Sequence, residues 1–112
     1  MTKIVFLLLL LLPVSITAQQ PNKKKLAAEV KAEFMHAWAG YKKYAWGHDD
    51  LKPLSKTYRD WYAEPLLMTP VDSLDTMIIM GLDQEAATTK AYILETLSFD
   101  KKIQVQYFVI TI

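Results

Sequence analysis

Apolar residues recur at steps of three and four along one segment in the first half of the chain. They are Leu26, Val30, Phe34, Ala37, Trp38, Tyr41 and Ala45. This spacing places them on one stripe of an α-helix, which we expect to cover residues 23–46. The helix should end at Gly47, because glycine readily adopts the left-handed conformation that closes many helices. Burial of a large apolar side chain contributes about 1.5 to 3 kcal/mol, so other elements must cover this stripe.

The helical pattern is lost between residues 48 and 70. Pro53, Pro65 and Pro70 indicate an irregular loop there. Large apolar side chains in its second half predict that the loop is packed rather than flexible, and these are Trp61, Tyr62, Leu66 and Leu67.

Two shorter helices are predicted after this loop. Asp72 or Ser73 can cap the first, which would extend to residue 80 before Gly81 breaks it. Asp83 can cap the second, which would extend to about residue 97. The apolar face of the second helix would contain Ala86, Ala87, Ala91, Ile93, Leu94 and Leu97.

A two-residue alternation at the end of the chain predicts a strand. Ile103, Val105, Tyr107 and Val109 would share one face of it. No second strand is predicted to pair with it, and natural proteins normally guard against an unpaired apolar edge. We therefore interpret the end of the sequence as an interruption of a longer domain.

The first 18 residues have the three parts of a secretory signal peptide. Lys3 provides the positive end, residues 4–12 are apolar, and small or polar residues lead to Ala18, where we expect cleavage. The apolar run is too short for a spanning helix, which needs about 20 residues. Ile16 is bulkier than the residue usual at its place, which leaves an uncleaved membrane anchor as the alternative. Residues 19–25 are a predicted linker, and the protein is predicted to be secreted or periplasmic.

Composition limits the remaining possibilities. Without the leader, roughly 94 of the 112 residues remain, enough for one modest domain. The chain has no cysteine, so neither disulfides nor a thiolate metal site can stabilise it. A net charge of +1 indicates no nucleic-acid partner.

Several polar and aromatic residues could carry chemistry, but each has a structural interpretation as well. Asp72 and Asp75 could form an acid and base pair, yet their spacing at a helix start suits capping. The adjacent residues His48, Asp49 and Asp50 could bind a metal, although three neighbours rarely converge on one ion. Further candidates are His36, Trp38 and Tyr41, which could stack on a sugar but have the spacing of core residues, and Lys42 and Lys43, which we expect to be solvated.

Two long blocks resemble one known family. Residues 34–55, FMHAWAGYKKYAWGHDDLKPLS, resemble the opening motif of glycoside hydrolase family 47, the class I α-1,2-mannosidases. Residues 71–82, VDSLDTMIIMGL, resemble the next motif of the same family at the expected distance. The similarity continues through Leu97, Phe99 and Asp100, so the chain from residue 26 to residue 112 is interpreted as part of a family 47 catalytic domain.

The resemblance implies an inverting enzyme that trims α-1,2-linked mannose from oligosaccharides with the help of a calcium ion. It implies an all-α fold, an (α/α)7 barrel of seven helical hairpins, of which this chain would supply only the first helical segment. The calcium ligands and remaining carboxylates are expected beyond its end. For His48, Asp49, Asp72 and Asp75, the resemblance implies supporting structural roles.

One position departs from the family pattern. The family's catalytic acid is a glutamate that follows a phenylalanine, and here Val109 follows Phe108. Valine has no proton to donate to the leaving oxygen, although general acid catalysis typically contributes a factor of about 10² to 10⁴. We therefore expect no catalytic residue in this chain and no mannosidase activity from it alone.

Two other interpretations stay open. The chain could be a secreted or membrane-anchored helical binding module without catalysis. Alternatively, two or more copies could assemble, or the chain could complement a separately encoded remainder.

Overall fold

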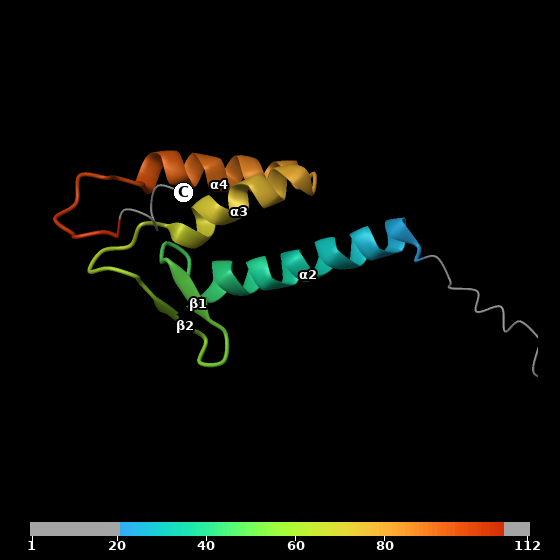
Figure 1. The fold of residues 1–112 in the computed structure, drawn as a ribbon, viewed down its shortest axis with the longest axis horizontal. Coiled ribbons are helices and arrows are strands. Elements are labelled where there is room, and N and C mark those ends of the chain that lie inside the picture. The colour runs from blue at the N-terminus through green and yellow to red at the C-terminus, as the bar shows by residue number, and fades with distance from the viewer. Residues whose placement is uncertain (1–20, 107–112) are drawn as a thin grey trace, which may run out of the picture.

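The computed structural model describes residues 21–106, so the predicted signal peptide, Tyr107 and Val109 lie outside the described range. The elements are α2 (Lys23–Tyr44), β1 (Asp50–Lys52), β2 (Thr57–Arg59), α3 (Met68–Ile79) and α4 (Asp83–Thr96). Figure 1 shows α3 and α4 side by side, α2 running along them, and the small hairpin at the carboxyl end of α2. The described part is mostly helical, in agreement with the predicted all-α class.

Helix α2 forms close to the predicted range. The Asn22 side chain caps it by accepting a hydrogen bond from the Lys25 N–H at 3.1 Å. The helix ends at Tyr44, two residues earlier than predicted. Gly47 has a φ of +86°, which confirms the predicted left-handed glycine, although it lies in the turn after the helix.

The apolar stripe of α2 is covered along only part of its length. Trp38, Tyr41 and Ala45 are buried and form the core with Met77 of α3 and Ala86 of α4. The other end of the stripe is uncovered, since Leu26 and Val30 are 47% and 56% exposed. The elements present therefore cover the apolar stripe only along the carboxyl-terminal half of the helix.

Both predicted amino-terminal caps were wrong. Helix α3 begins at Met68, so Asp72 and Ser73 lie inside it rather than at its cap. Helix α4 begins at Asp83 with Leu82 at the cap position, and no side chain caps it. Asp83 instead lies in the first turn with Glu85, where negative charge favours the positive end of the helix dipole.

The predicted face of α4 is confirmed in part. Ala86 is buried and Ile93 and Leu97 are half-buried, whereas Ala87 and Ala91 are exposed and Leu94 is 75% exposed. Thr89 is also buried, and it was missed because a threonine on a helix has no apolar signal of its own. The spacing of Ala86, Thr89 and Ile93 fits one helical stripe, narrower than the predicted face.

Strands form where an irregular loop was expected. Strands β1 and β2 pair antiparallel, with Leu51 opposite Tyr58. Each has only three residues, too few for an alternation to be recognised in the sequence. The strand predicted at the end of the chain does not form over residues 103–106.

Aromatic side chains join α2 to α4. Trp46 lies with its ring centroid 4.5 Å from that of Tyr92, and it meets Trp38 and Tyr41 edge-on at 5.9 and 6.0 Å. Such pairs contribute about 0.5 to 1.5 kcal/mol each beyond their burial. Within residues 21–106, no helix is both long enough and apolar enough to cross a membrane.

Gly47 should tolerate no side chain. A Cβ atom there would lie 2.9 Å from the Tyr92 hydroxyl, in addition to the left-handed backbone. We expect Gly47→Ala to lower the free energy of unfolding by about 1 to 2 kcal/mol for the backbone alone, and further for the contact. Denaturant titration followed by circular dichroism measures this loss.

Gly81→Ala is the matched control, because Gly81 has a φ of +65° but open space around its Cβ position. It should lose only the backbone part. Adding Tyr92→Phe to Gly47→Ala should recover part of the contact loss. Equal losses for the two glycine variants would contradict the role of Tyr92.

Candidate functional site

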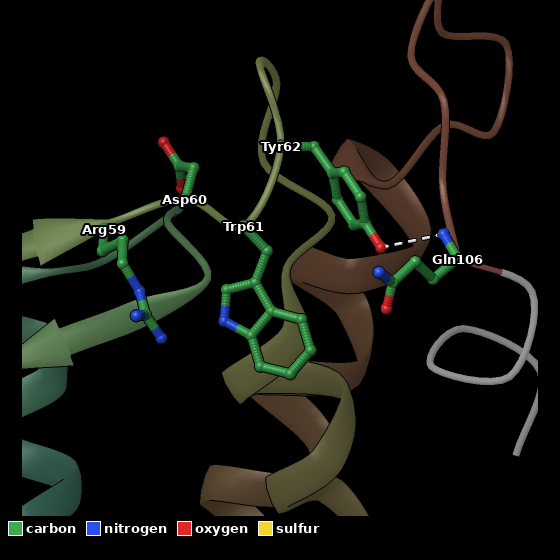
Figure 2. A pocket seen from close by; sticks show the side chains of 5 residues that line it. All are labelled: Arg59, Asp60, Trp61, Tyr62 and Gln106. Atoms are coloured by element: carbon green, nitrogen blue, oxygen red, sulfur yellow. Dashed lines mark hydrogen bonds between the residues drawn. The ribbon is translucent and has the colours of Figure 1, made fainter.

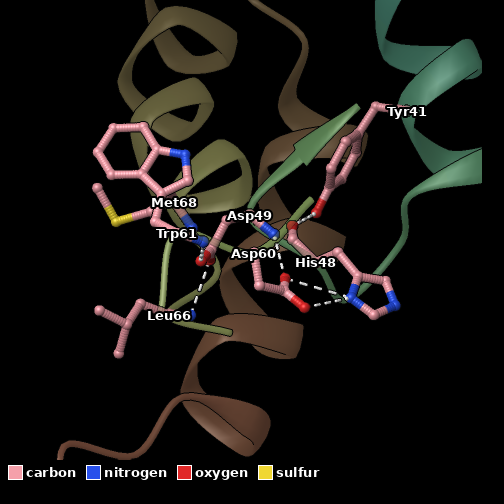
Figure 3. A network of polar contacts seen from close by, with 7 residues as sticks. All are labelled: Tyr41, His48, Asp49, Asp60, Trp61, Leu66 and Met68. Carbon is pink, nitrogen blue, oxygen red and sulfur yellow. Dashed lines mark hydrogen bonds and ion pairs between the residues drawn. The ribbon is translucent and has the colours of Figure 1, made fainter. Parts of the chain in front are cut away.

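The densest polar network is centred on Asp49, which is fully buried (Figure 3). Three backbone N–H groups donate hydrogen bonds to its carboxylate. They belong to Leu66, Trp61 and Met68, at 2.7, 3.0 and 3.2 Å. The backbone carbonyl of Asp49 also accepts from the N–H and hydroxyl groups of Thr69. One residue therefore holds the whole loop that leads into α3.

This network explains why α3 begins at Met68. The first N–H groups of a helix have no partner within it, and a nearby carboxylate satisfies them and favours the helix dipole. Asp49 supplies that carboxylate from a position 19 residues before Met68. Leu67, just before the helix, takes a left-handed φ of 57°, which the bonds on both sides of it fix.

His48 is connected to the Asp49 network through Asp60. Its ring Nδ1 lies 3.0 Å from an oxygen of Asp60, and its ring stacks on Tyr58 with centroids 3.4 Å apart. Asp60 in turn accepts the Asp49 backbone N–H at 3.0 Å. The Tyr41 hydroxyl donates to the His48 carbonyl at 2.7 Å, and burial raises the pKa of that hydroxyl, which keeps its proton.

Asp50 points away from its neighbour Asp49. Its carboxylate pairs with the Arg59 guanidinium and accepts the Trp61 indole N–H at 2.7 Å. The carboxylates of Asp49, Asp50 and Asp60 are thus each already bonded to N–H donors. Calcium requires about six to eight oxygen ligands, so this cluster does not fit a calcium ion. No group of three or more metal-ligating side chains occurs within residues 21–106.

Asp72 and Asp75 lie on the exposed side of α3. Asp75 accepts the N–H of its neighbour Thr76 at 2.6 Å, a local contact only. With three apolar residues of the same helix, Val71, Leu74 and Ile78, the two aspartates line an open hollow of about 450 Å³. The structure therefore does not bring them to the Asp49 network.

A second open hollow, of about 430 Å³, lies beside β2 (Figure 2). Its lining consists of Arg59, Asp60, Trp61, Tyr62 and Gln106. The Tyr62 hydroxyl accepts the Gln106 N–H at 3.1 Å. Trp61 and Tyr62 were expected only to pack in the loop, and Arg59 and Asp60 belong to no recognisable motif. The lining of the hollow includes one carboxylate, that of Asp60, and this carboxylate is already hydrogen-bonded to the ring of His48.

The aromatic candidates divide between core and surface. Trp38 and Tyr41 stack with centroids 5.2 Å apart and are buried, which confirms their prediction as core residues. His36 is exposed on α2.

Lys42 is paired rather than simply solvated, contrary to the prediction. Its ammonium group donates to the Glu85 carboxylate at 2.9 Å, and the Trp38 indole N–H donates to the same carboxylate at 2.9 Å. Glu85 was missed because its partners lie 43 and 47 residues away in the sequence. It bridges α2 and α4.

The sequence pattern of Glycosyl hydrolase family 47 matches residues 33–112, most of the chain. The chain belongs to glycosyl hydrolase family 47. Among curated family 47 relatives, the rat "Endoplasmic reticulum mannosyl-oligosaccharide 1,2-alpha-mannosidase" is 46% identical over 92 residues, which are 82% of this chain and 13% of the rat protein. The human protein of the same name is 44% identical, over 70% of this chain and 11% of its own length.

A plant relative of family 47 gives the same result. The "Mannosyl-oligosaccharide 1,2-alpha-mannosidase MNS1" of Arabidopsis thaliana is 40% identical over 84% of this chain and 17% of its own length. The chain thus spans roughly an eighth of the length of the curated relatives that it matches.

The two family 47 blocks can now be placed on the helices and strands of the structure. The first, residues 34–55, covers the second half of α2, Asp49 itself and β1, and the second, residues 71–82, covers most of α3. The backbone N–H groups that donate to the Asp49 carboxylate belong to Trp61, Leu66 and Met68, which lie between the two blocks. Val109 lies within the matched range but outside the described residues.

Asp49→Asn should destabilise this family 47 segment strongly. An amide of the same size loses the charge and places an NH₂ group against backbone donors. We expect a loss of about 3 kcal/mol in the free energy of unfolding. Amide hydrogen exchange should show lost protection at the N–H groups of Leu66 and Met68.

Asp50→Asn is the control, because it is the adjacent residue and its Arg59 partner is 59% exposed. Its loss should not exceed about 1 kcal/mol. If both variants lost the same free energy, the central position of Asp49 would be disproved.

The hydrogen bonds of Glu85 should make the free energy of unfolding depend on pH in the acidic range. The pKa of Glu85 is lowered below its ordinary 4.5, first by the hydrogen bond from Lys42 and then by that from Trp38. A lowered pKa in the folded state stabilises the fold above the unfolded pKa, and this contribution is lost as pH falls through the folded pKa. We expect Glu85→Gln to reduce the loss of stability on acidification below about pH 4.5, and denaturant titration followed by circular dichroism at each pH measures it.

Glu95→Gln, at an exposed position on the same helix, is the control and should leave the acid dependence unchanged. A Glu85→Gln variant whose acid dependence equals that of the original chain would contradict the bridge.

Proposed function

We propose that this chain forms the opening helical segment of an α-1,2-mannosidase domain that trims mannose-containing oligosaccharides, and that it does not cleave them alone. One observation carries the proposal: the family 47 match to residues 33–112, together with relatives named mannosyl-oligosaccharide 1,2-alpha-mannosidases. The chain corresponds to about an eighth of those proteins, so its contribution to the activity is that of a part.

The described residues provide a framework rather than acid and base groups. An inverting glycosidase needs two carboxylates about 6.5 to 9.5 Å apart, with a water molecule between one of them and the sugar. Within residues 21–106, the carboxylates of Asp49, Asp50 and Asp60 are committed to N–H donors, and Asp72 and Asp75 lie on an exposed helix face. The resemblance to the family's motif would place Val109 at the position of the catalytic acid, which supports the same proposal.

In the proposed domain, this framework would hold α3 and α4 in place against α2. Asp49 fixes the start of α3 against the end of α2, and Glu85 with the aromatic cluster fixes α4 against α2. Consecutive helices held in this way are what an (α/α)7 barrel requires of its first segment. The barrel itself is part of the proposal.

Calcium and localisation complete the proposal. The Asp49 cluster does not fit calcium, so ligands for a calcium ion would come from outside residues 21–106. Residues 1–18 would direct the protein to a secreted or periplasmic location, or anchor it to a membrane if they are not cleaved.

The first experiment tests the chain alone. The purified protein is incubated with an α-1,2-linked mannobiose and calcium, with the rat mannosidase as positive control. We expect no release of mannose above the uncatalysed rate. Calcium-dependent release by this chain would falsify the proposal.

The second experiment tests the framework role. Residues 33–106 replace the matching segment of the rat mannosidase, which keeps its own residue at the Val109 position. We expect the chimera to retain mannosidase activity and to lose thermal stability when Asp49→Asn is added, because the segment then no longer holds α3. A folded chimera without activity would count against the framework role.

A further inference from the structure

The last described segment, residues 97–106, returns to the loop between β2 and α3. It contains no helix or strand, and Figure 1 shows it leaving the end of α4 and turning back toward that loop. The Lys101 ammonium group donates to the Glu64 carboxylate at 3.5 Å. The Gln106 backbone N–H donates to the Tyr62 hydroxyl at 3.1 Å (Figure 2). Two side chains of the loop therefore contact the end of the described chain.

The hydrogen bond to Tyr62 restrains this segment more than the ion pair does. It acts on the main chain at Gln106, so it fixes the course of the backbone itself. The ion pair joins two flexible side chains, and that of Glu64 is 49% exposed. Exposed ion pairs contribute only about 0 to 1 kcal/mol. Tyr62 is half-buried and its side chain is rigid, so little conformational entropy is lost when its hydroxyl is held in place.

The Asp49 network fixes the position of Tyr62 in turn. The N–H groups of Trp61 and Leu66 both donate to the Asp49 carboxylate, at 3.0 and 2.7 Å. Tyr62 directly follows Trp61, and only residues 62–65 lie between the two attachment points. A loop this short, held at both ends by one buried carboxylate, has few conformations available. The place of the Tyr62 hydroxyl therefore depends on Asp49.

The restrained backbone at Gln106 lies three residues before Val109 in the sequence. One residue spans at most about 3.6 Å of extended chain, so position 109 can lie no farther than about 11 Å from Gln106. The family resemblance would place the catalytic acid at this position. A general acid must be within hydrogen-bond reach of the leaving oxygen, and a displacement of about 1 Å can cost a factor of about 100 in rate. The backbone course at Gln106 therefore bears on where such an acid can stand.

We propose that Tyr62 is a positioning residue of the family 47 domain. Its hydroxyl holds the main chain at Gln106 and thereby limits where the side chain at position 109 can lie. The contacts form one path, from the Asp49 carboxylate through the loop to Tyr62 and on to Gln106. This inference rests on the proposed function, since only an active domain carries an acid at position 109.

Amide hydrogen exchange of the full 112-residue chain tests the contact itself. Tyr62→Phe removes one oxygen atom and keeps the ring, so the loop should stay folded. We expect the Gln106 N–H to exchange about fivefold faster in the variant, because it loses its acceptor. The N–H groups of Leu66 and Met68, which donate to Asp49, should keep their protection. Unchanged exchange at Gln106 would overturn the proposal.

Tyr58→Phe is the matched control. Tyr58 lies on β2, is 50% exposed, and contributes to the network through its ring, which stacks on His48 and which phenylalanine retains. This variant should leave exchange at Gln106 unchanged. If it accelerated that exchange as much as Tyr62→Phe does, the assignment of the contact to the Tyr62 hydroxyl would be wrong.

Enzyme kinetics test the positioning role. The chimera proposed above carries residues 33–106 of this chain and the rat protein's own residue at the Val109 position. With Tyr62→Phe added, we expect kcat to fall about tenfold while KM changes by less than about twofold, because the acid is displaced and sugar binding is not. Tyr58→Phe should change neither constant.

The pH profile separates positioning from a loss of folded enzyme. The alkaline side of the kcat profile reports the acid in the enzyme–substrate complex, so Tyr62→Phe should shift it. A loss of folded enzyme would lower kcat by the same factor at every pH, and that result would overturn the positioning role.

The remaining outcomes distinguish this inference from the proposed function. An active chimera whose kcat and pH profile are unaffected by Tyr62→Phe would overturn the positioning role and leave the proposed function standing. A folded but inactive chimera would count against the proposed framework role, and against this inference with it.

Discussion

A single buried carboxylate sets the arrangement of the rest of the structure. Asp49 has no exposed surface, and an unpaired charge in that place would cost several kcal/mol. The chain avoids this cost by bringing backbone N–H groups from residues 61, 66 and 68 to one side chain. Because these groups come from the irregular segment between β2 and α3 and from the first residue of α3, the carboxylate gives that segment a shape that its own sequence does not specify.

The position of each helix follows from that shape. The loop delivers Met68 to the start of α3, and the turn at Gly81 returns the chain as α4. Glu85 of α4 then contacts Trp38 on α2, and Tyr92 of α4 contacts Trp46 in the turn after α2, which completes the core around Met77. The first family 47 block therefore contains Asp49, and the second contains most of α3, the helix whose start Asp49 fixes.

This set of helices leaves apolar surface uncovered at both ends. Leu26 and Val30 on α2 and Ile78 and Ile79 on α3 are exposed although their helices pack well elsewhere. A small set of helices cannot cover all sides of its central member, because each helix offers only one or two faces. The proposed framework role follows from this geometry, because the remaining elements of a larger domain would cover these sides.

The local features of this protein could be predicted from its amino-acid sequence. The stripe of α2, the left-handed Gly47 and the two family blocks were all readable, because helical period, glycine conformation and motif order depend on neighbouring residues. Other features depend on the tertiary structure. Asp49 is buried, whereas the adjacent Asp50 pairs with the exposed Arg59. The start of α3 at Met68, the pairing of Lys42 with Glu85 and the packed side of α4 are further examples. These outcomes rest on hydrogen bonds and contacts between residues 9 to 47 positions apart, and no local pattern records such pairings.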